Sequence, residues 1–486
     1  MRKIVFCFVF FFSLFTCRAQ EIFQRSYGGS GSDHGRAVIE CSTGGYLVVG
    51  STNSFYDPSA DMYLLRVDEA GDYLWGRNIG ESGTPEWAVD VMEDDDGNFL
   101  IAGYGINSEN SSYDGILLKT DSEGNELWMK YYGGSDWDFF EAMTTDADGN
   151  IYLAGQTSES GVQKGWIVKV NEIGVVLNEI QIEETGDARL TGIAICENGT
   201  IVFGGDVYNP QTEEQFFIGG RLTDTGTLDW TTVITEQYFS AGKCDCNSEN
   251  NLLSTGREPA LSESGESTNM GVLKLNGSDG QLQWFQVFNT ELNYKGRGFA
   301  ISNDDFLYVG GAGENICCDD YDSYTAVLTP NGEAVSAEFT DAFGGADLEK
   351  LYDIAVTSDG GYIATGETRS FGNNFQVHLV KLDQDGTRDE TNEDFLDIAT
   401  TDHITEADQS IRVYPNPASA MVTIETPSDI DRVTLISTRG VMLLEKKFPR
   451  GLSNIALDMS EYGSGIYTVQ IELSNGSIFH RKISRR

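Results

Sequence analysis

The chain has 486 residues, of which 76 are Asp or Glu and 32 are Lys or Arg, so its formal net charge is −44. So acidic a protein repels phosphate backbones, which argues against nucleic-acid binding and leaves cations, basic partners and neutral glycans open as ligands. Only four histidines occur, far apart in the sequence, so His-based metal sites and Ser-His-Asp chemistry are poorly supplied.

The N-terminal segment has the three-part layout of a secretory signal peptide. Arg2 and Lys3 precede an unbroken apolar run over 4–15, and Cys17-Arg18-Ala19 offers a small-x-small cleavage site. The apolar run is about a dozen residues, too short for a bilayer core of about 30 Å. We therefore expect residues 1–19 to be removed on export and the mature protein to have no transmembrane segment.

A repeat of about 52 residues fills the chain from residue 21 to about residue 387. Each copy has a short β-rich apolar run behind a Gly/Asn/Asp turn, as at 46–50, 99–103 and 362–366. This run ends in glycine in every copy, at Gly50, Gly103, Gly155, Gly205, Gly256, Gly310 and Gly366. A further strand and a second glycine turn follow. A last strand then carries a tryptophan in four copies, at Trp75, Trp128, Trp230 and Trp284.

Four short strands per repeat, joined by tight turns with no helical stretch, predict an all-β fold. One such unit cannot bury both of its faces, whereas radial stacking buries them and leaves only short edges. A β-helix uses much shorter repeats, and tandem sandwiches need longer ones. We therefore expect residues 20–387 to form a seven-bladed β-propeller, with the tryptophans packed between blades rather than serving a quinoprotein cofactor pocket.

The two ends of the repeat region complement each other. The last copy lacks a fourth strand, because the sequence turns polar and acidic from Thr387. A strand of the missing pattern stands at 21–29 (EIFQRSYGG). We expect this strand to complete the last blade and close the ring.

The segment 21–390 resembles the repeats of secreted bacterial propeller proteins. Their pattern is best displayed at 27–50 (YGGSGSDHGRAVIECSTGGYLVVG) and 343–366 (FGGADLEKLYDIAVTSDGGYIATG). The resemblance implies a fold and no particular activity, because propellers host hydrolases, lyases, quinoproteins and inert scaffolds alike.

Two further segments follow the repeats. Residues 388–410 are acidic and poorly apolar, and we expect a flexible linker. Residues 411–486 contain about six alternating strand-length runs, which predict a small antiparallel β-sandwich.

The C-terminal segment closely resembles the type A C-terminal sorting domain of the type IX secretion system found in Bacteroidetes. The residues that carry the resemblance are Tyr414, Pro415, Asn416 and Pro417 at the entry, Gly440 in the central hairpin, Gly465 and Tyr467 in the GIYTV run, and the basic C-terminus. The resemblance implies passage through the periplasm and the outer membrane by the type IX machinery. A cell-surface protease would then cut within 388–410, leaving the protein attached to the surface or released.

A ligand site is expected on the face formed by the long, variable loops, because variable loops on a rigid scaffold often carry function. The candidate residues are Trp87, Trp137, Phe139, Tyr294, Asp136, Asp138 and Arg297. Aromatic and acidic side chains around a shallow mouth suit sugar stacking with hydrogen bonds to hydroxyls. The alternative is structural: the acidic residues tie each blade to its neighbour, and the aromatic residues fill the wedges between blades.

Acidic turns at 93–96 and 146–148 share only the opening of a calcium-binding loop and lack its downstream glutamate. We expect no cofactor and no metal at these turns, and calcium stays open elsewhere on the acidic face.

Six cysteines remain after removal of the signal peptide. Cys244 and Cys246 lie in the fifth repeat, and Cys317 and Cys318 lie in a loop of the sixth. One interpretation is a single disulfide between these two pairs. Cys41 and Cys196 occupy equivalent positions in repeats too far apart to pair, and we expect buried thiols there.

These observations favour an exported, non-enzymatic binding protein that engages a glycan, a protein or another extracellular partner. One alternative is a carboxylate-dependent polysaccharide hydrolase or lyase, which two acids at the mouth would serve. Another is a structural component of an extracellular matrix. No catalytic residue is assigned.

Overall fold

The structure is a computed structural model, and it describes residues 22–54, 59–81, 83–223, 225–259, 268–288, 293–315, 320–335, 347–370, 374–386, 397–399, 412–414, 421–426, 429–437, 442–449, 451–460, 462–463, 465–474 and 478–485. The chain divides into two compact units, Met1–Ala399 and Thr400–Arg486. The signal peptide predicted at 1–19 lies outside the described residues. Within the described part of the chain, no helix is long and apolar enough to cross a membrane.

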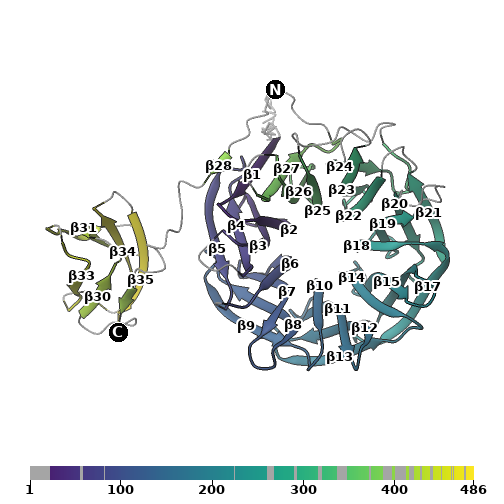
Figure 1. The fold of residues 1–486 in the computed structure, drawn as a ribbon, viewed down its shortest axis with the longest axis horizontal. Helices are drawn as coiled ribbons and strands as arrows, with labels where there is room; N and C mark the ends of the chain where they lie inside the picture. Colours follow the sequence, from purple (N-terminus) through teal and green to yellow (C-terminus); the bar gives the residue numbers. More distant parts are fainter. Residues whose placement is uncertain are drawn as a thin grey trace, which may run out of the picture. The chain divides into compact units, whose positions relative to one another are not determined.

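The described residues of the first unit form seven antiparallel sheets arranged around a common axis (Figure 1). The first three run from the innermost to the outermost strand in chain order. They contain β2 (Asp33–Glu40), β3 (Tyr46–Thr52), β4 (Asp61–Val67) and β5 (Tyr73–Ile79); β6 (Glu86–Glu93), β7 (Phe99–Asn107), β8 (Ser112–Thr120) and β9 (Glu126–Tyr132); and β10 (Asp138–Thr145), β11 (Ile151–Glu159), β12 (Val162–Val170) and β13 (Val176–Ile182).

The next three sheets continue in the same order. They contain β14 (Asp187–Ile195), β15 (Ile201–Asn209), β16 (Glu214–Leu222) and β17 (Leu228–Tyr238); β18 (Ser240–Cys246), β19 (Leu252–Pro259), β20 (Thr268–Leu275) and β21 (Leu282–Phe288); and β22 (Asn293–Ile301), β23 (Leu307–Asn315) and β24 (Asp320–Leu328). The all-β propeller prediction is confirmed.

The last sheet is built from both ends of the repeat region. It contains β25 (Glu349–Val356), β26 (Tyr362–Thr368), β27 (Gln376–Leu382), β1 (Phe23–Gly28) and β28 (Asp397–Ala399). Strand β1 pairs antiparallel with β27, with Phe23 opposite Lys381 and Tyr27 opposite Val377. The expected closure of the ring by the N-terminal strand is therefore present.

Strand β28 lies inside the segment expected to be a flexible linker. Its three residues pair in parallel with β1, opposite Ser26 to Gly28. The expectation of a wholly unstructured linker is corrected at 397–399, where the outer edge of β1 offers unpaired backbone groups to an extra strand. The other residues of the predicted linker lie outside the described ones.

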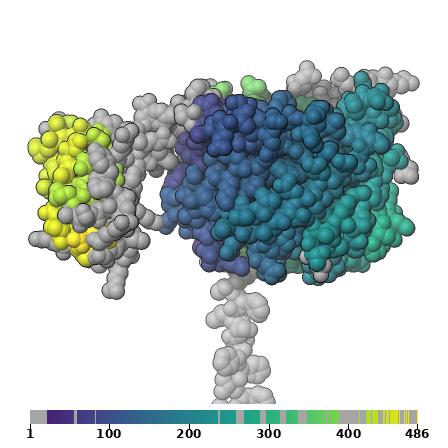
Figure 2. All heavy atoms as spheres, turned by 90° about the horizontal axis from the view of Figure 1, so that it is seen from below, coloured from purple at the N-terminus to yellow at the C-terminus, as the bar shows by residue number. Residues whose placement is uncertain are grey.

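The core is a ring of seven apolar clusters, each shared by two neighbouring sheets. One cluster, for example, joins Leu47 and Leu64 of the β2–β5 sheet to Ile101 and Leu118 of the next sheet. The cluster that closes the series joins Phe23 and the last sheet to the first. Because the second and third strands of a sheet, such as β3 and β4, are buried along their whole length, the sheets bury both faces against their neighbours. Seen from the side, the sheets pack into a continuous wall (Figure 2).

The turn between the first two strands of a sheet repeats one hydrogen-bond pattern. Asp94 Oδ1 accepts from the backbone N–H groups of Asp96 and Asn98, at 3.0 and 2.8 Å. Gly97 follows in the left-handed region with φ of 77°, where a side chain would be strained. Asp146 does the same with Asp148 and Asn150. The Asp-x-x-Gly motif therefore encodes the hairpin.

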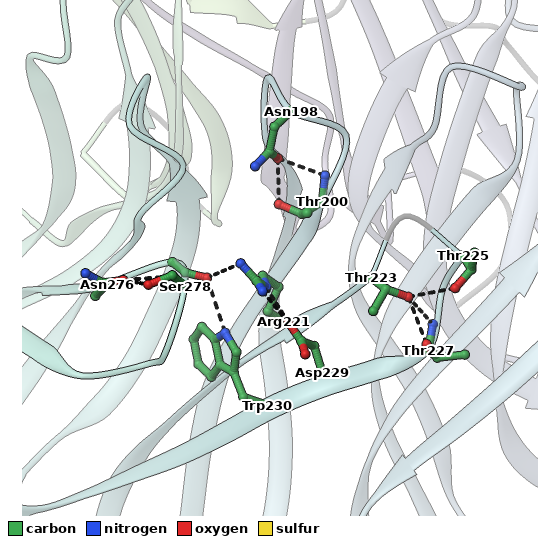
Figure 3. Close-up of polar contacts among 11 residues, drawn as sticks. Asn198, Thr200, Arg221, Thr223, Thr225, Thr227, Asp229, Trp230, Asn276 and Ser278 are labelled. Carbon is green, nitrogen blue, oxygen red and sulfur yellow. Dashed lines mark hydrogen bonds and ion pairs between the residues drawn. The ribbon is translucent and has the colours of Figure 1, made fainter.

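The tryptophans of four outer strands pack against the glycine turn of the next sheet. A Cβ on Gly280 would lie 2.7 Å from the Trp230 ring, and one on Gly332 would lie 2.9 Å from the Trp284 ring. Figure 3 shows Trp230 donating its indole N–H to the Gly277 carbonyl of the neighbouring sheet, at 3.2 Å, while Arg221 donates to the same carbonyl and pairs with Asp229. The expected packing of tryptophans between sheets is what the structure shows.

The second unit contains two sheets with a core of their own. One contains β29 (Arg412–Tyr414), β30 (Met421–Glu425) and β33 (Asn454–Asp458), and the other contains β31 (Ile430–Ser437), β32 (Met442–Lys447), β34 (Gly465–Leu473) and β35 (Ile478–Arg485). Their buried side chains form one cluster that includes Ile424, Val433 and Val469. Buried and outward residues alternate along β30 and β33, as a two-sheet sandwich requires.

Candidate functional site

A β-bulge interrupts the innermost strand of every sheet at the same place. The pairing with the second strand skips one residue in six sheets and two residues in β18. A bulge leaves the extra residue unpaired and re-aims its side chain. The bulged residues, which we call the bulge ring, are Arg36, Val89, Glu141, Thr191, Gly242 with Lys243, Arg297 and Tyr352.

The bulge ring lines a cavity of about 400 Å³ in the channel. All members of the ring contribute to its wall. The remaining wall residues come from the strand ends on the side of the long loops, and they are Trp87, Tyr104, Arg189, Ser240, Ala241, Arg257 and Gly296. The shared backbone irregularity thus turns one side chain per sheet toward a common space.

The cavity wall is cationic although the protein is strongly acidic. Arg36, Arg189, Lys243, Arg257 and Arg297 contribute positive charges, and Glu141 is the one carboxylate among the described residues of the wall. Burial lowers the pKa of Arg297, and the neighbouring positive charges of Arg36 and Arg257 lower it further. Like charges held this close favour a bound anion.

Tyr352 lies between two of these cations. The guanidinium carbon of Arg36 is 4.1 Å from the centre of the Tyr352 ring, and that of Arg297 is 5.0 Å from it. Stacking on an aromatic face fixes a guanidinium while leaving its N–H groups free to bind. Burial raises the pKa of Tyr352 to about 12, so its hydroxyl is neutral at physiological pH.

Lys243 closes the bottom of the cavity. Its ammonium group lies 2.8 Å from Asp353 Oδ1 and 3.3 Å from Asp90 Oδ1, so one lysine connects three sheets across the channel. The other carboxylate oxygens accept backbone N–H groups of Val38 and Met143. Although burial opposes its charge, the two aspartates raise the pKa of Lys243. A second cavity, of about 380 Å³, lies on the other side of this cross-link.

The residues proposed from the sequence fall in three places. Trp87 and Arg297 line the cavity. Phe139 and Trp137 lie beside it in an aromatic group, with the Phe139 ring 4.8 Å from that of Tyr104. Tyr294 belongs to β22 by its backbone, and its side chain lies outside the described part of the structure.

Asp138 and Asp136 hold loops in place rather than lining the cavity. Asp138 accepts from the Gly134 N–H at 2.7 Å and from the Thr157 hydroxyl at 2.5 Å, as Asp33 does with Gly29 in the first sheet. Asp136 accepts from the Ser160 N–H at 2.7 Å.

Most of the cavity residues were missed in the sequence. The missed residues lie in strands, whereas the ligand site was expected on the long loops. They are Arg36, Glu141, Lys243 and Tyr352. These residues could have been found by aligning the repeats, because they occupy the same position in each copy. In the first copy, Arg36 stands at this position between the small residues Gly35 and Ala37. Net charge concealed the site, because it averages a small cationic wall with an acidic exterior.

The acidic hairpin turns are satisfied internally. The second carboxylate oxygen of Asp94 pairs with Lys119 at 2.7 Å, and that of Asp146 pairs with Lys169 at 3.1 Å. Across the described residues, no three His, Cys, Asp or Glu side chains gather as metal ligands. The expectation of no cofactor, with calcium open elsewhere on the acidic face, stays a prediction.

The cysteine interpretation is corrected by the structure. Cys246 forms a disulfide with Cys196, with the Cα atoms 5.4 Å apart, and Cys244 and Cys41 are buried free thiols. The expectation of a free Cys196 was wrong, because that residue was compared with Cys41 and not with the adjacent repeat, whose innermost strand ends beside it. Cys317 and Cys318 lie outside the described residues.

The sorting-motif residues belong to the second unit. Gly465 begins β34, and the Tyr467 hydroxyl donates to the Gly463 carbonyl at 2.7 Å. Tyr414 ends β29. Pro415, Asn416, Pro417 and Gly440 lie outside the described residues.

Comparison with known proteins agrees with both units. A family described as a secretion system C-terminal sorting domain matches residues 412–485, and a domain of unknown function described as a beta-propeller matches residues 357–391. The regulatory protein FlaEY of Caulobacter vibrioides is 23% identical over 323 residues, covering 53% of this chain and 33% of that protein. The chain thus spans about a third of the length of this curated relative.

Solved structures of similar fold have low identity. An ulvan lyase, a polysaccharide lyase, is 10% identical with a TM-score of 0.52, covering 75% of this chain and 97% of that chain. The extracellular domain of a putative one component system from B. thetaiotaomicron is 12% identical with a TM-score of 0.41, covering 93% of this chain and 56% of that chain. At this identity the ulvan lyase likeness shows the fold alone. The chain is therefore an exported β-propeller protein that carries a C-terminal sorting domain of the type IX secretion system, which directs it to the cell surface or out of the cell.

Proposed function

We propose that the exported propeller binds an anionic extracellular ligand in the channel cavity. The observation that carries this proposal is the pair of arginines, Arg36 and Arg297, held on the two sides of Tyr352 by bulges of their strands. Charge-assisted hydrogen bonds from arginine to carboxylate or sulfate groups are strong and directional. A cavity beneath the long loops, with fixed donors on a rigid scaffold, suits binding.

The test is a thermal-shift titration of the full chain with glucuronate and sulfate as probes, and with glucose as the neutral control. We expect both anions at millimolar concentration to raise the melting temperature, and glucose to leave it unchanged. The double variant Arg36→Gln/Arg297→Gln should lose the shift. The matched variant Arg77→Gln, on outer strand β5, should keep it. Equal shifts in all three proteins would refute the proposal.

A polysaccharide lyase is the second candidate. Elimination needs a cation that holds the carboxylate and a base that removes the neighbouring proton, and Arg36, Arg297 and Tyr352 offer both groups. The raised pKa of Tyr352 opposes its use as a base, so binding is the leading proposal. A two-carboxylate hydrolase finds less support, because the described cavity wall offers only Glu141. Release of an unsaturated product from ulvan, lost in Tyr352→Phe, would favour the lyase.

A further inference from the structure

A row of aromatic side chains leads from the cavity wall to the loop before β10. Trp87 and Tyr104 line the cavity, and their ring centres are 5.3 Å apart. The Phe139 ring is 4.8 Å from that of Tyr104 and 5.8 Å from that of Tyr113. The Tyr113 ring is 5.8 Å from that of Trp137. We call these five residues the aromatic row.

The aromatic row is accessible, unlike the aromatic core nearby. Trp137 is 62% exposed, and the other four side chains are half-buried. Phe140 and Trp166 stack 4.9 Å apart in the same region and are 0% and 3% exposed. A side chain that only filled the wedge between two sheets would not be as exposed as Trp137 is. The open faces of the row are therefore available for stacking.

Resting on the proposed function, we propose that the ligand is an acidic polysaccharide. One charged sugar unit occupies the cavity against Arg36 and Arg297, and the following units stack along the aromatic row toward Trp137. Sugar rings present C–H faces that pack on aromatic rings, while their carboxylate or sulfate groups pair with arginine. The cavity and the row share Trp87 and Tyr104, so one chain contacts both.

The charge distribution selects against more densely charged polymers. The net charge of −44 repels a nucleic acid, whose charges follow every few ångströms. Asp136 lies beside Trp137 in the sequence and is half-buried, whereas Asp138 is buried, so Asp136 is the carboxylate that a densely charged chain would meet there. A polysaccharide with one acidic group per sugar unit, or per two, places its charge in the cavity and its apolar faces on the row.

The experiment measures binding of the full chain to fragments of polygalacturonate and of κ-carrageenan of increasing length, to neutral dextran and to galacturonate monomer by calorimetry. We expect affinity for the acidic chains to rise with length, and dextran to bind far less. Trp137→Ala should weaken long fragments about tenfold without affecting the monomer. Arg297→Gln should weaken both. The matched control Leu127→Ala removes a 53% exposed side chain of outer strand β9 and should change neither.

The outcomes separate this inference from the proposed function. Polygalacturonate and κ-carrageenan, which has one sulfate per two sugar units, distinguish carboxylated from sulfated chains, and binding of either one supports the inference. Monomer binding that depends on Arg297, without a gain for longer fragments, overturns the polysaccharide and keeps the anion site. Equal binding of dextran, or binding unchanged in Arg297→Gln, overturns both. Unchanged binding of long fragments in Trp137→Ala removes the aromatic row from the proposal.

Discussion

The outermost and innermost strands of the propeller repeat in different ways. Two outer strands share one side-chain contact: Tyr27 of β1 and Tyr132 of β9 each donate to the carbonyl of the next sheet's glycine turn, at 2.6 and 2.8 Å. In the innermost strands the bulge repeats but the side chain changes, as from Arg36 to Val89 to Glu141. Repetition of side chains indicates a stabilising role, and repetition of backbone with varied side chains indicates positions free to serve a ligand.

The largest effect on stability is expected from removal of β1, by deletion of residues 22–28. The deletion removes the buried side chains Phe23 and Tyr27 and the pairing with β27, and it exposes the edge of β27. We expect the melting temperature to fall by on the order of 10 °C or more. A chain that begins at residue 22 is the control and should melt like the longer one. An unchanged melting temperature after the deletion would mean that the ring does not depend on this strand.

Lys243→Met should be the exception among the inner positions. It leaves Asp90 and Asp353 buried without their shared cation, at an expected cost of about 3–5 kcal/mol in the free energy of unfolding. Burial raises the pKa of Asp353, so protonation of this carboxyl group relieves part of that cost, and the loss measured by urea unfolding should be smaller at pH 4 than at pH 8. A loss that does not change with pH would contradict the charge explanation.

The disulfide between Cys196 and Cys246 joins two neighbouring inner strands. Its removal in Cys196→Ser/Cys246→Ser should cost about 2–4 kcal/mol, because it closes a long loop in the unfolded chain. Peptide mapping without reductant should recover a fragment that links residues 196 and 246. A Cys246 linked to another cysteine in that map would overturn the pairing.

Glu86, at the start of β6, should make stability depend on pH. Burial raises its pKa to about 7 from 4.5, and the charge of Asp61 adds to this. As the pH rises, this carboxyl group loses its proton in the unfolded chain before it does so in the folded chain. The free energy of unfolding therefore falls between about pH 4.5 and about pH 7. Glu86→Gln should raise the free energy of unfolding by about 1–3 kcal/mol at pH 8 and change it little at pH 4. Equal effects at both pH values would contradict this assignment.

The smallest effects are expected at neutral members of the bulge ring. The side chains of Val89 and Thr191 line the cavity. We expect Val89→Ala and Thr191→Ser to shift the melting temperature by no more than about 2 °C. Losses as large as that of the β1 deletion would break the distinction between inner and outer strands.

Features that depend on residues close together in the sequence could be predicted. Features that depend on how the strands pair, such as the bulges, could not. The Asp-x-x-Gly turns, the strand-ending glycines such as Gly50, and the matching ends of the repeat region were all readable from spacing. The bulges were not, because one unpaired residue hardly disturbs a short alternating pattern. The cationic wall was missed for a related reason: Arg36 and Arg297 are distant in sequence, and only the closed ring brings both to Tyr352.

The pairing of β1 with β27 also bears on how the protein is made. The first strand synthesised has no partner until the last of the repeats has emerged, some 350 residues later. The apolar cluster that unites Phe23 and Tyr27 with the last sheet can form only then, so the ring is completed after the whole repeat region has been synthesised.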